Sequence, residues 1–427
     1  MSWTVPSKKS MVLFFLVLTA FSLVYSPFLL SDGFIGLSAL AFFKWKNAKG
    51  QLSFMPDVER FRILSPLRPH FPVLSFVLVF AVVLWAGWPV RDWDFWFDRL
   101  RMKAPFLVLP FTFILLPEIT RREYLGVLYF FVAILFLTCI GVGINYLNHF
   151  DEINIALKEG RSIPVPRHHI RFSVLMSIGI VAGLYLYREG FYLFRQWERK
   201  LVGGMTLFLF VFIHVLSVRS GLAALYFALF VLLVRYILMK RKYLIGLGLA
   251  AALLAVPFMA YKTVSSFQAK VDYMRYDWYM FRQGEGGINS DSGRFASLAA
   301  GWDIFRKHPL AGVGAANLRV EVRDYIEKHY PGFEVHMPPN QFLYVMSGTG
   351  LIGLAVFIFG FFYPLMIRTM RRDLFFLGLY AILLMNMMTD HSMEASMSVG
   401  MACFFSLLGL KRGRVREGEG VREGERG

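Results

Sequence analysis

The sequence predicts an all-α polytopic membrane protein with about twelve transmembrane helices and one large, partly helical loop outside the membrane. Three observations support this fold class. Hydrophobic residues make up 56% of the chain and charged residues only 18%, whereas soluble proteins contain about 45–50% and about 25%. The apolar residues come in runs long enough to cross a hydrocarbon layer about 30 Å thick. A long polar stretch, 261–340, interrupts these runs in the second half of the chain.

Hydropathy gives the expected positions of the helices along the chain. The first run follows Lys8 and Lys9 and lacks a small-residue cleavage site, so we expect it to be retained as a membrane span. The spans are expected at 11–30, 33–44, 71–89, 104–117, 124–147, 171–187, 200–217, 220–238, 243–262, 341–367, 374–390 and 394–410.

These spans divide the chain into four parts. We expect an N-terminal transmembrane bundle at 1–260, a loop domain at 261–340, C-terminal transmembrane helices at 341–412 and a charged tail at 413–427. The tail is rich in Gly, Arg and Glu and has little apolar surface to bury, so we expect it to be disordered.

The chain has a net charge of +17, and the positions of its basic residues follow the expected membrane topology. Connections on one side of the expected membrane carry 27 of the 46 Lys and Arg residues, and loops rich in these residues face the cytoplasm. The polar stretch is exempt from this rule because of its length. We therefore expect both termini in the cytoplasm and the long loop outside. The basic surplus would attract anionic membrane lipids, and we expect no nucleic-acid partner.

The interiors of the expected spans contain no Asp or Glu. Coupled transporters keep ionisable groups at the bilayer midplane, so this pattern argues against a coupled transporter. We expect His214 to be a hydrogen-bonded histidine of the bundle. Cys139 and Cys403 lie in apolar runs and predict neither a disulfide nor a metal site. The segment 90–103 mixes aromatic and charged residues, as connectors that lie on the membrane surface do.

The long loop is expected to contain two helices separated by a turn. Ser292 is expected to cap the first helix, whose apolar residues recur at spacings of three and four. Gly312 and Gly314 predict a tight turn, and a second helix is expected at 319–330. Upstream, the aromatic-rich stretch 264–283 is expected to lie along the membrane.

Three arginines are candidates for binding an anion at the outer face. Arg294 is expected in the first turn of a helix, where backbone N–H groups, the helix dipole and a guanidinium suit a phosphate. Arg219 lies between two spans, and Arg171 lies at the outer mouth of a third. The alternatives are pairing of Arg294 with Asp291 or a headgroup and snorkelling of Arg219 to headgroups. Together the three arginines would suit a diphosphate.

Histidines of the loop are candidates for a general base, because a neutral imidazole can accept a proton from a hydroxyl. An ordinary surface histidine is the alternative for each of them. The candidates are His308, His329 and His336.

Several motifs follow one another between residues 291 and 354: Ser292-Gly-Arg294, His308-Pro-Leu-Ala-Gly-Val-Gly314, Pro339-Asn340-Gln-Phe-Leu-Tyr and Gly348-Thr-Gly-Leu-Ile-Gly353. This order resembles that of the bacterial O-antigen ligase/polymerase family. The Ser-Val-Arg-Ser-Gly sequence around Arg219 and the layout of the spans extend the resemblance over most of the chain.

The resemblance implies a multi-spanning, glycosyltransferase-like enzyme of the bacterial inner membrane with its large loop in the periplasm. Such enzymes serve lipopolysaccharide and polysaccharide biosynthesis. They transfer a glycan from undecaprenyl diphosphate to a hydroxyl of lipid A-core or of another glycan repeat unit, without a metal or other cofactor. The resemblance also implies that Arg219 and Arg294 bind the diphosphate. The family usually has His-Asn where this chain has Pro339-Asn340, so either His336 supplies the base or this member works differently or is impaired.

We therefore expect an inverting, metal-independent membrane glycan ligase or polymerase. Arg171, Arg219, Arg294 and Asn340 are expected to bind substrate, and His336, Arg294 and Arg219 to act in catalysis. A transporter or flippase for lipid-linked glycans and a non-catalytic family member are the alternatives.

Overall fold

The computed structural model describes residues 6–45, 55–87, 90–158, 161–283 and 290–424. These residues form helices and contain no β-strand beyond a single bridge between Phe43 and Pro56. The α-helices are α1 (Lys8–Tyr25), α2 (Pro27–Phe42), α3 (Val58–Phe61), α4 (Phe71–Leu74), α5 (Val77–Trp85), α6 (Trp93–Leu115), α7 (Arg121–Asn148), α8 (Phe150–Lys158), α9 (His169–Arg188), α10 (Glu198–Leu216), α11 (Arg219–Lys240), α12 (Tyr243–Thr263), α13 (Ser265–Arg282), α14 (Ser290–Lys307), α15 (Leu318–His329), α16 (Gln341–Phe362), α17 (Arg368–Arg372), α18 (Leu374–Thr389) and α19 (Ser396–Gly424). Short 3₁₀ turns are η1 (Arg62–Leu64), η2 (Arg68–His70), η3 (Tyr363–Met366) and η4 (Ser392–Glu394).

Capping side chains mark where several helices begin. Thr120 and Glu123 form a capping box at the start of α7, and Asp373 accepts a backbone N–H at the start of α18. Ser26 caps α2, and Pro27 occupies its first position. The run expected as one span at 11–30 is therefore divided between α1 and α2.

Seven described helices are long and apolar enough to cross a membrane, and α4 with α5 makes an eighth span if this pair, bent by 62°, counts as one. The expected number of about twelve is therefore not confirmed, although a helix occupies each expected position. Helices α2 and α18 are apolar but have only 16 residues. The chain is a polytopic helical membrane protein. The seven are α1, α7, α9, α10, α11, α12 from Gly246, and α16.

The prediction of a surface connector at 90–103 is wrong. Asp92 caps α6, which begins at Trp93 and continues through this segment into the bundle. Phe95 and Lys103 are buried. A charged segment can enter the bundle here because its charges find partners, which the next subsection describes.

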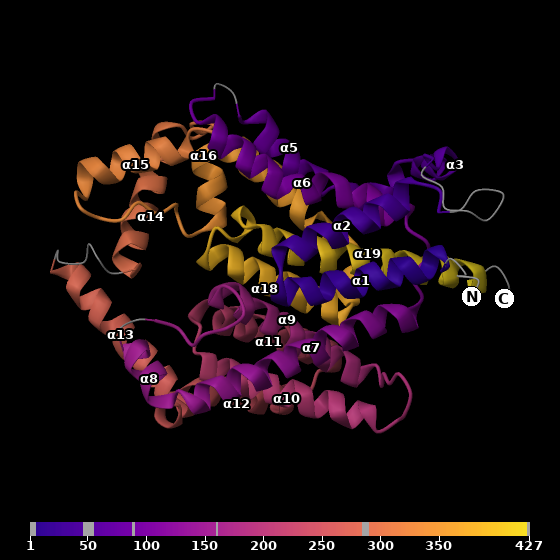
Figure 1. Cartoon of the computed structure of the whole chain (residues 1–427), viewed down its shortest axis with the longest axis horizontal. Helices are drawn as coiled ribbons and strands as arrows, with labels where there is room; N and C mark the ends of the chain where they lie inside the picture. The colour runs from indigo at the N-terminus through magenta and orange to yellow at the C-terminus, as the bar shows by residue number, and fades with distance from the viewer. Residues whose placement is uncertain (1–5, 46–54, 88–89, 159–160, 284–289, 425–427) are drawn as a thin grey trace, which may run out of the picture.

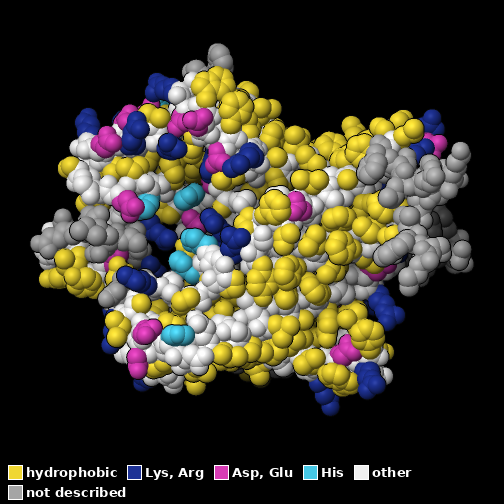
Figure 2. Space-filling model, in the orientation of Figure 1, with side chains coloured by type: hydrophobic (Ala, Val, Ile, Leu, Met, Phe, Trp, Pro, Cys, Tyr) yellow, Lys and Arg dark blue, Asp and Glu magenta, His cyan; other side chains and the backbone are white. Residues whose placement is uncertain are grey.

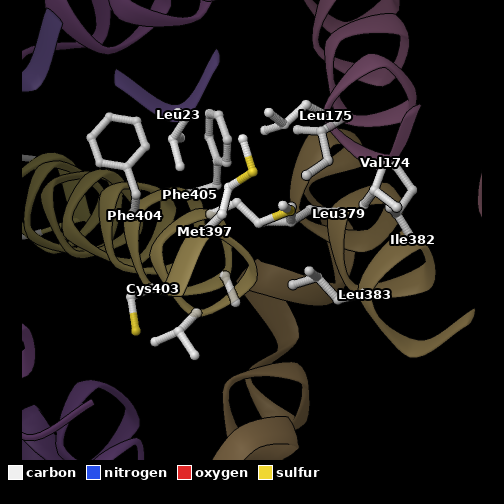
Figure 3. Close-up of a cluster of buried hydrophobic side chains, with 14 of the residues drawn as sticks. Leu23, Val174, Leu175, Leu379, Ile382, Leu383, Met397, Cys403, Phe404 and Phe405 are labelled. Atoms are coloured by element: carbon white, nitrogen blue, oxygen red, sulfur yellow. The ribbon is translucent and has the colours of Figure 1, made fainter. Parts of the chain in front are cut away.

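The centre of the bundle is apolar. Leu23 of α1, Leu175 of α9, Leu379 of α18 and Phe405 of α19 are fully buried and point toward one another (Figure 3). In a membrane, close packing of such side chains supplies the attraction between helices, because lipid tails are as apolar as the side chains. This packing holds α9, α18 and α19 in fixed positions beneath the polar end of the bundle.

The two chain termini lie at one end of the molecule, and α13, α14 and α15 lie at the opposite end (Figure 1). The second expected loop helix is confirmed as α15. The expected N-cap is wrong, because α14 already begins at Ser290 and Ser292 lies in its first turn. The Ser292 hydroxyl instead donates to the Asp277 carboxylate of α13 at 3.2 Å. Helix α19 continues to Gly424, into the segment expected to be a disordered tail.

Closely packed glycines join the turn of the loop domain to α16. The expected turn is confirmed by the positive φ angles of Gly312 (67°) and Gly314 (92°). The Gly314 N–H donates to the Gly348 carbonyl at 2.9 Å. At Gly350, where φ is 65°, an added Cβ would lie 2.1 Å from the Leu310 carbonyl oxygen. Only glycine allows both backbones to approach this closely, so this contact fixes the loop over the end of the bundle.

Candidate active site

Helix beginnings gather at the polar end of the bundle. Helices α9 and α11 begin side by side, because Gly221 packs so closely on Ser173 that an added Cβ would lie 2.4 Å from the Ser173 Cβ. Helix α14 packs along α16, where the Ser347 hydroxyl donates to the Gly301 carbonyl at 2.8 Å. The first turn of each helix presents backbone N–H groups without a partner in the helix and the positive end of its dipole. This end of the bundle is therefore suited to an anion.

Two of the predicted arginines, Arg171 of α9 and Arg294 of α14, act on the same histidine. Both are partly buried. Burial lowers the pKa of His168, which precedes α9, and the positive charges of Arg171 and Arg294 lower it further, while Asp390 opposes them. The structure thus places both arginines, from distant parts of the chain, where their charges act on His168. Arg294 lies just beyond the first turn, because α14 begins earlier than expected.

Arg219 is the first residue of α11 and is exposed. It lies two residues before Gly221, and Arg171 lies two residues before Ser173, the residue on which Gly221 packs. The two arginines therefore occupy neighbouring helix beginnings.

His336 lies against the Ser-Gly-Arg segment of α14. An added Cβ at Gly293 would come within 2.9 Å of the His336 Cδ2, so the glycine makes room for the imidazole. The His336 Nε2 lies 3.3 Å from a carboxylate oxygen of Glu334, and the His336 side chain is 40% exposed. The predicted histidine and the predicted Arg294 are therefore close in space.

Asn340 uses its side chain to fix the start of α16. Its Oδ1 accepts the Leu343 N–H at 3.0 Å, and its amide donates to the Met388 carbonyl of α18 at 3.1 Å. Both ends of the Asn340 side chain thus make structural bonds, and its second amide N–H is the group left for the substrate contact that the sequence predicts.

A buried ion pair stabilises the start of α16. The sequence analysis did not predict this pair. Lys103 of α6 donates to Glu394 at 2.5 Å, and Arg99 lies 3.6 Å from the other carboxylate oxygen. Gln341 donates to Glu394 at 3.0 Å and accepts the Met393 N–H at 2.8 Å. This ion pair is difficult to predict from the sequence, because Lys103 and Glu394 lie at the edges of expected spans, where charged residues are common.

Beside this pair lies a cavity of about 20 Å³, with room for about one water molecule. Its polar lining comes from Arg99, Lys103, Tyr344 and Glu394.

His391 is the second functional candidate that sequence reasoning missed. It follows α18, and its Nδ1 lies 3.3 Å from Oδ1 of Asp390. Its ring stacks on Tyr344 of α16 at 5.9 Å between centroids. Burial lowers the pKa of His391, and Arg99 and Arg171 lower it further, while Asp390 and Glu394 oppose them. At neutral pH the imidazole is therefore uncharged and can accept a proton.

Histidine, lysine and arginine side chains gather around a hollow in the surface between the α14–α15 region and the rest of the bundle (Figure 2). We call the group formed by His168, Arg171, Arg294, His336, Asp390 and His391 the cationic mouth. Its positive charges could hold a diphosphate, and its imidazoles could accept a proton from a hydroxyl.

Residues 204–358 match the family model described as O-antigen ligase. These residues are similar to the O-antigen ligase family. The resemblance drawn from the motifs is therefore confirmed, and the match indicates a membrane enzyme with a ligase or polymerase role in polysaccharide assembly. No curated protein matches the sequence.

The matched residues include Arg219, Arg294, His336 and Asn340, whereas Arg171 and His391 lie outside them. The cationic mouth is thus completed by elements before and after the matched residues. Arg171 could be predicted because it lies at the mouth of an expected span, whereas no motif of the sequence marks His391.

The remaining histidines singled out in the sequence lie elsewhere. His214 is confirmed as a bundle histidine, because its Nε2 is 2.7 Å from the Tyr226 hydroxyl and its Nδ1 is 2.8 Å from the Phe210 carbonyl. The exposed His329 contacts a carbonyl of its own helix at 3.0 Å, and His308 is exposed. Among the described residues, no group of three His, Cys, Asp or Glu side chains could hold a metal ion.

Proposed function

We propose that this protein transfers a glycan from undecaprenyl diphosphate to a sugar hydroxyl at the periplasmic face of the bacterial inner membrane. The observation that carries the proposal is that Arg171 and Arg294, from distant parts of the chain, both act on His168 with their positive charges, while His336 packs against Gly293, the neighbour of Arg294. Helix α14, which carries Arg294, lies at the end of the bundle opposite the start of α1 and the end of α19 (Figure 1). The acceptor would be lipid A-core in a ligase or another repeat unit in a polymerase.

The donor would bind through its diphosphate. The guanidinium groups of Arg171 and Arg294, with Arg219 on the neighbouring helix beginning, match the planar pairs of oxygens of a phosphate. The helix beginnings add N–H groups and positive dipole ends. The polyprenyl chain would extend into the lipid, with these arginines at the level of the lipid headgroups.

The reaction would be a single displacement. The acceptor oxygen attacks the anomeric carbon from the face opposite the diphosphate, so the configuration at that carbon inverts. Negative charge grows on the departing diphosphate, and arginines placed beforehand stabilise it more in the transition state than in the bound donor. Arginine charge would serve here without a metal ion or other cofactor.

Reconstitution of the purified full-length protein with a polyprenyl-diphosphate glycan and a glycan acceptor tests the proposal. The expected result is a longer glycan or a glycan on a new lipid, formed by the wild type. Movement of the donor between leaflets without a new bond would indicate a flippase, and neither event would indicate a non-catalytic protein. Either result would overturn the proposal.

Deletion in cells would separate ligase from polymerase. Loss of all attached surface chains indicates a ligase, whereas attachment of single repeat units indicates a polymerase.

A further inference from the structure

The attacking hydroxyl must lose a proton, and the cationic mouth holds three imidazoles, of which that of His168 stacks on His169 and has no carboxylate paired with it among the described residues. Pro339, immediately before Asn340, has no side chain that could accept the proton. The surroundings of His336 and His391 differ in how firmly each ring is held and in how each is connected to the arginines.

The surroundings of His391 restrict its ring. The ring stacks on Tyr344, and the His391 backbone carbonyl accepts the Glu394 N–H at 3.1 Å, which fixes the turn that carries the ring. Its Nδ1 is buried without a hydrogen-bond partner and lies 3.3 Å from Oδ1 of Asp390. The side chain is still 32% exposed, and this exposure belongs to its other atoms. A carboxylate beside one nitrogen of a partly exposed ring is the arrangement from which a general base and its orienting acid can form their hydrogen bond when substrate binds.

His336 lacks such support. Its nearest carboxylate, Glu334, is 79% exposed and lies on the same loop. An exposed carboxylate is hydrated and mobile and orients an imidazole poorly. Asp390 is only 22% exposed and also acts on Arg171. The charge of this carboxylate therefore acts on both the His391 ring and a guanidinium of the mouth.

We propose that His391, oriented by Asp390, is the general base of the transfer reaction. This inference rests on the proposed function. The acceptor O–H would donate its proton to Nε2 of His391 as its oxygen forms the bond to the anomeric carbon. The bond from that carbon to the diphosphate oxygen breaks, and its electron pair leaves with undecaprenyl diphosphate. The imidazolium, paired with Asp390, then releases the proton to water.

The charged groups around His391 predict how kcat/KM depends on pH. Asp390 and Glu394 favour the imidazolium, and Arg99 and Arg171 disfavour it, as does burial, which dominates. The base is therefore active at neutral pH, and the acid limb of kcat/KM lies below the ordinary histidine pKa of about 6.5. Asp390 is a positioning residue, and its loss should move this limb further toward acid.

The test uses the full-length protein in proteoliposomes with a polyprenyl-diphosphate glycan donor and a glycan acceptor. We expect His391→Gln to lower kcat about 100-fold or more, as loss of a general base does, with little change in the KM of the donor. In His391→Ala, added imidazole should restore part of the rate. Asp390→Asn should lower kcat and shift the acid limb. His336→Ala should cost less than His391→Gln, and His329→Gln, the matched exposed histidine, should match the wild type.

Two outcomes separate the base assignment from the proposed function. If the wild type forms product and His391→Gln retains its rate and acid limb, the base assignment is wrong and the transfer function stands. A second combination of results would also overturn the base assignment, in favour of a structural role for His391. In that case His391→Gln would be slower and thermally less stable but would keep its acid limb, and imidazole would not rescue His391→Ala. If the wild type itself forms no product, the proposed function fails first.

Discussion

Two groups of basic residues lie near each other in this protein, and they differ in how far nearby carboxylates balance their positive charge. Arg99 and Lys103 are enclosed in the bundle, and Glu394 and Asp98 lie beside them. At the cationic mouth, His169 lies near Lys270 and Arg294, and Asp390 is the carboxylate that acts on His168 and Arg171. Positive charge is balanced in the first group and exceeds negative charge in the second.

This difference separates structure from function. A buried charge is tolerated only with a partner, since removal from water costs several kcal/mol for each ion. The first group, in which Arg99 and Lys103 are matched by Asp98 and Glu394, therefore fixes α6, η4 and the start of α16 in place; we call it the matched group. An excess of positive charge at a partly hydrated surface remains available to an anionic ligand. The comparison predicts that substitutions in the two groups will change different properties.

The largest expected effect on stability comes from breaking the matched group. Glu394→Ala leaves Lys103 buried without its carboxylate, so the free energy of unfolding should fall by about 3–5 kcal/mol. Thermal unfolding of the detergent-solubilised protein measures this. Replacing both Lys103 and Glu394 by Met should recover most of the loss, because neither charge then remains buried. A single variant as stable as the wild type would contradict the matched-pair interpretation.

The largest expected effect on activity comes from the mouth. Arg294→Ala should lower kcat/KM by about 10²–10³, the usual cost of removing one donor to a developing anion, with little change in melting temperature. Arg306→Ala, at an exposed arginine of the same helix, is the control and should leave the rate unchanged. Equal losses in the two variants would show that α14 is sensitive to any loss of positive charge.

A smaller effect is expected where the two loop motifs meet. Gly293→Ala adds a Cβ that would lie 2.9 Å from the His336 Cδ2, so the ring and the segment before Asn340 must shift. A displacement of this size near reacting groups should lower the transfer rate about tenfold. Gly204→Ala is the matched control, because an added Cβ there meets nothing within 4 Å. If Gly293→Ala kept the full rate, the close packing of His336 would have no bearing on activity.

The smallest effect concerns the pH dependence of stability without substrate. The pKa values of His168 and His391 are lowered in the folded protein, so the unfolded chain binds more protons below about pH 6.5. Stability should be complete above this pH and should fall as the pH drops toward the folded-state pKa values. Melting temperatures between about pH 7.5 and 5 measure this. The double variant His168→Gln/His391→Gln should show a flatter profile, and an equally steep one would exclude these two histidines.

Much of the fold could be predicted because it is encoded locally. Runs of apolar residues predicted helices at each expected position, and the glycines of the 312–314 turn predicted its geometry. The number of full spans could not be predicted as well, because hydropathy does not detect a break such as Ser26-Pro27 or the bend between α4 and α5. The entry of residues 93–103 into the bundle was also missed, because a charged segment is buried only when a distant partner meets it.

The sequence by itself determined the helical membrane class, the O-antigen ligase motifs and the arginines that a diphosphate would need. These properties depend on composition and on residues close together in the chain. Only the tertiary structure decided that Lys103 meets Glu394, 291 positions away, and that His391 lies near Arg99 of α6 and Arg171 of α9. Such meetings depend on how the helices pack, and packing depends on many weak contacts that no single stretch of sequence contains.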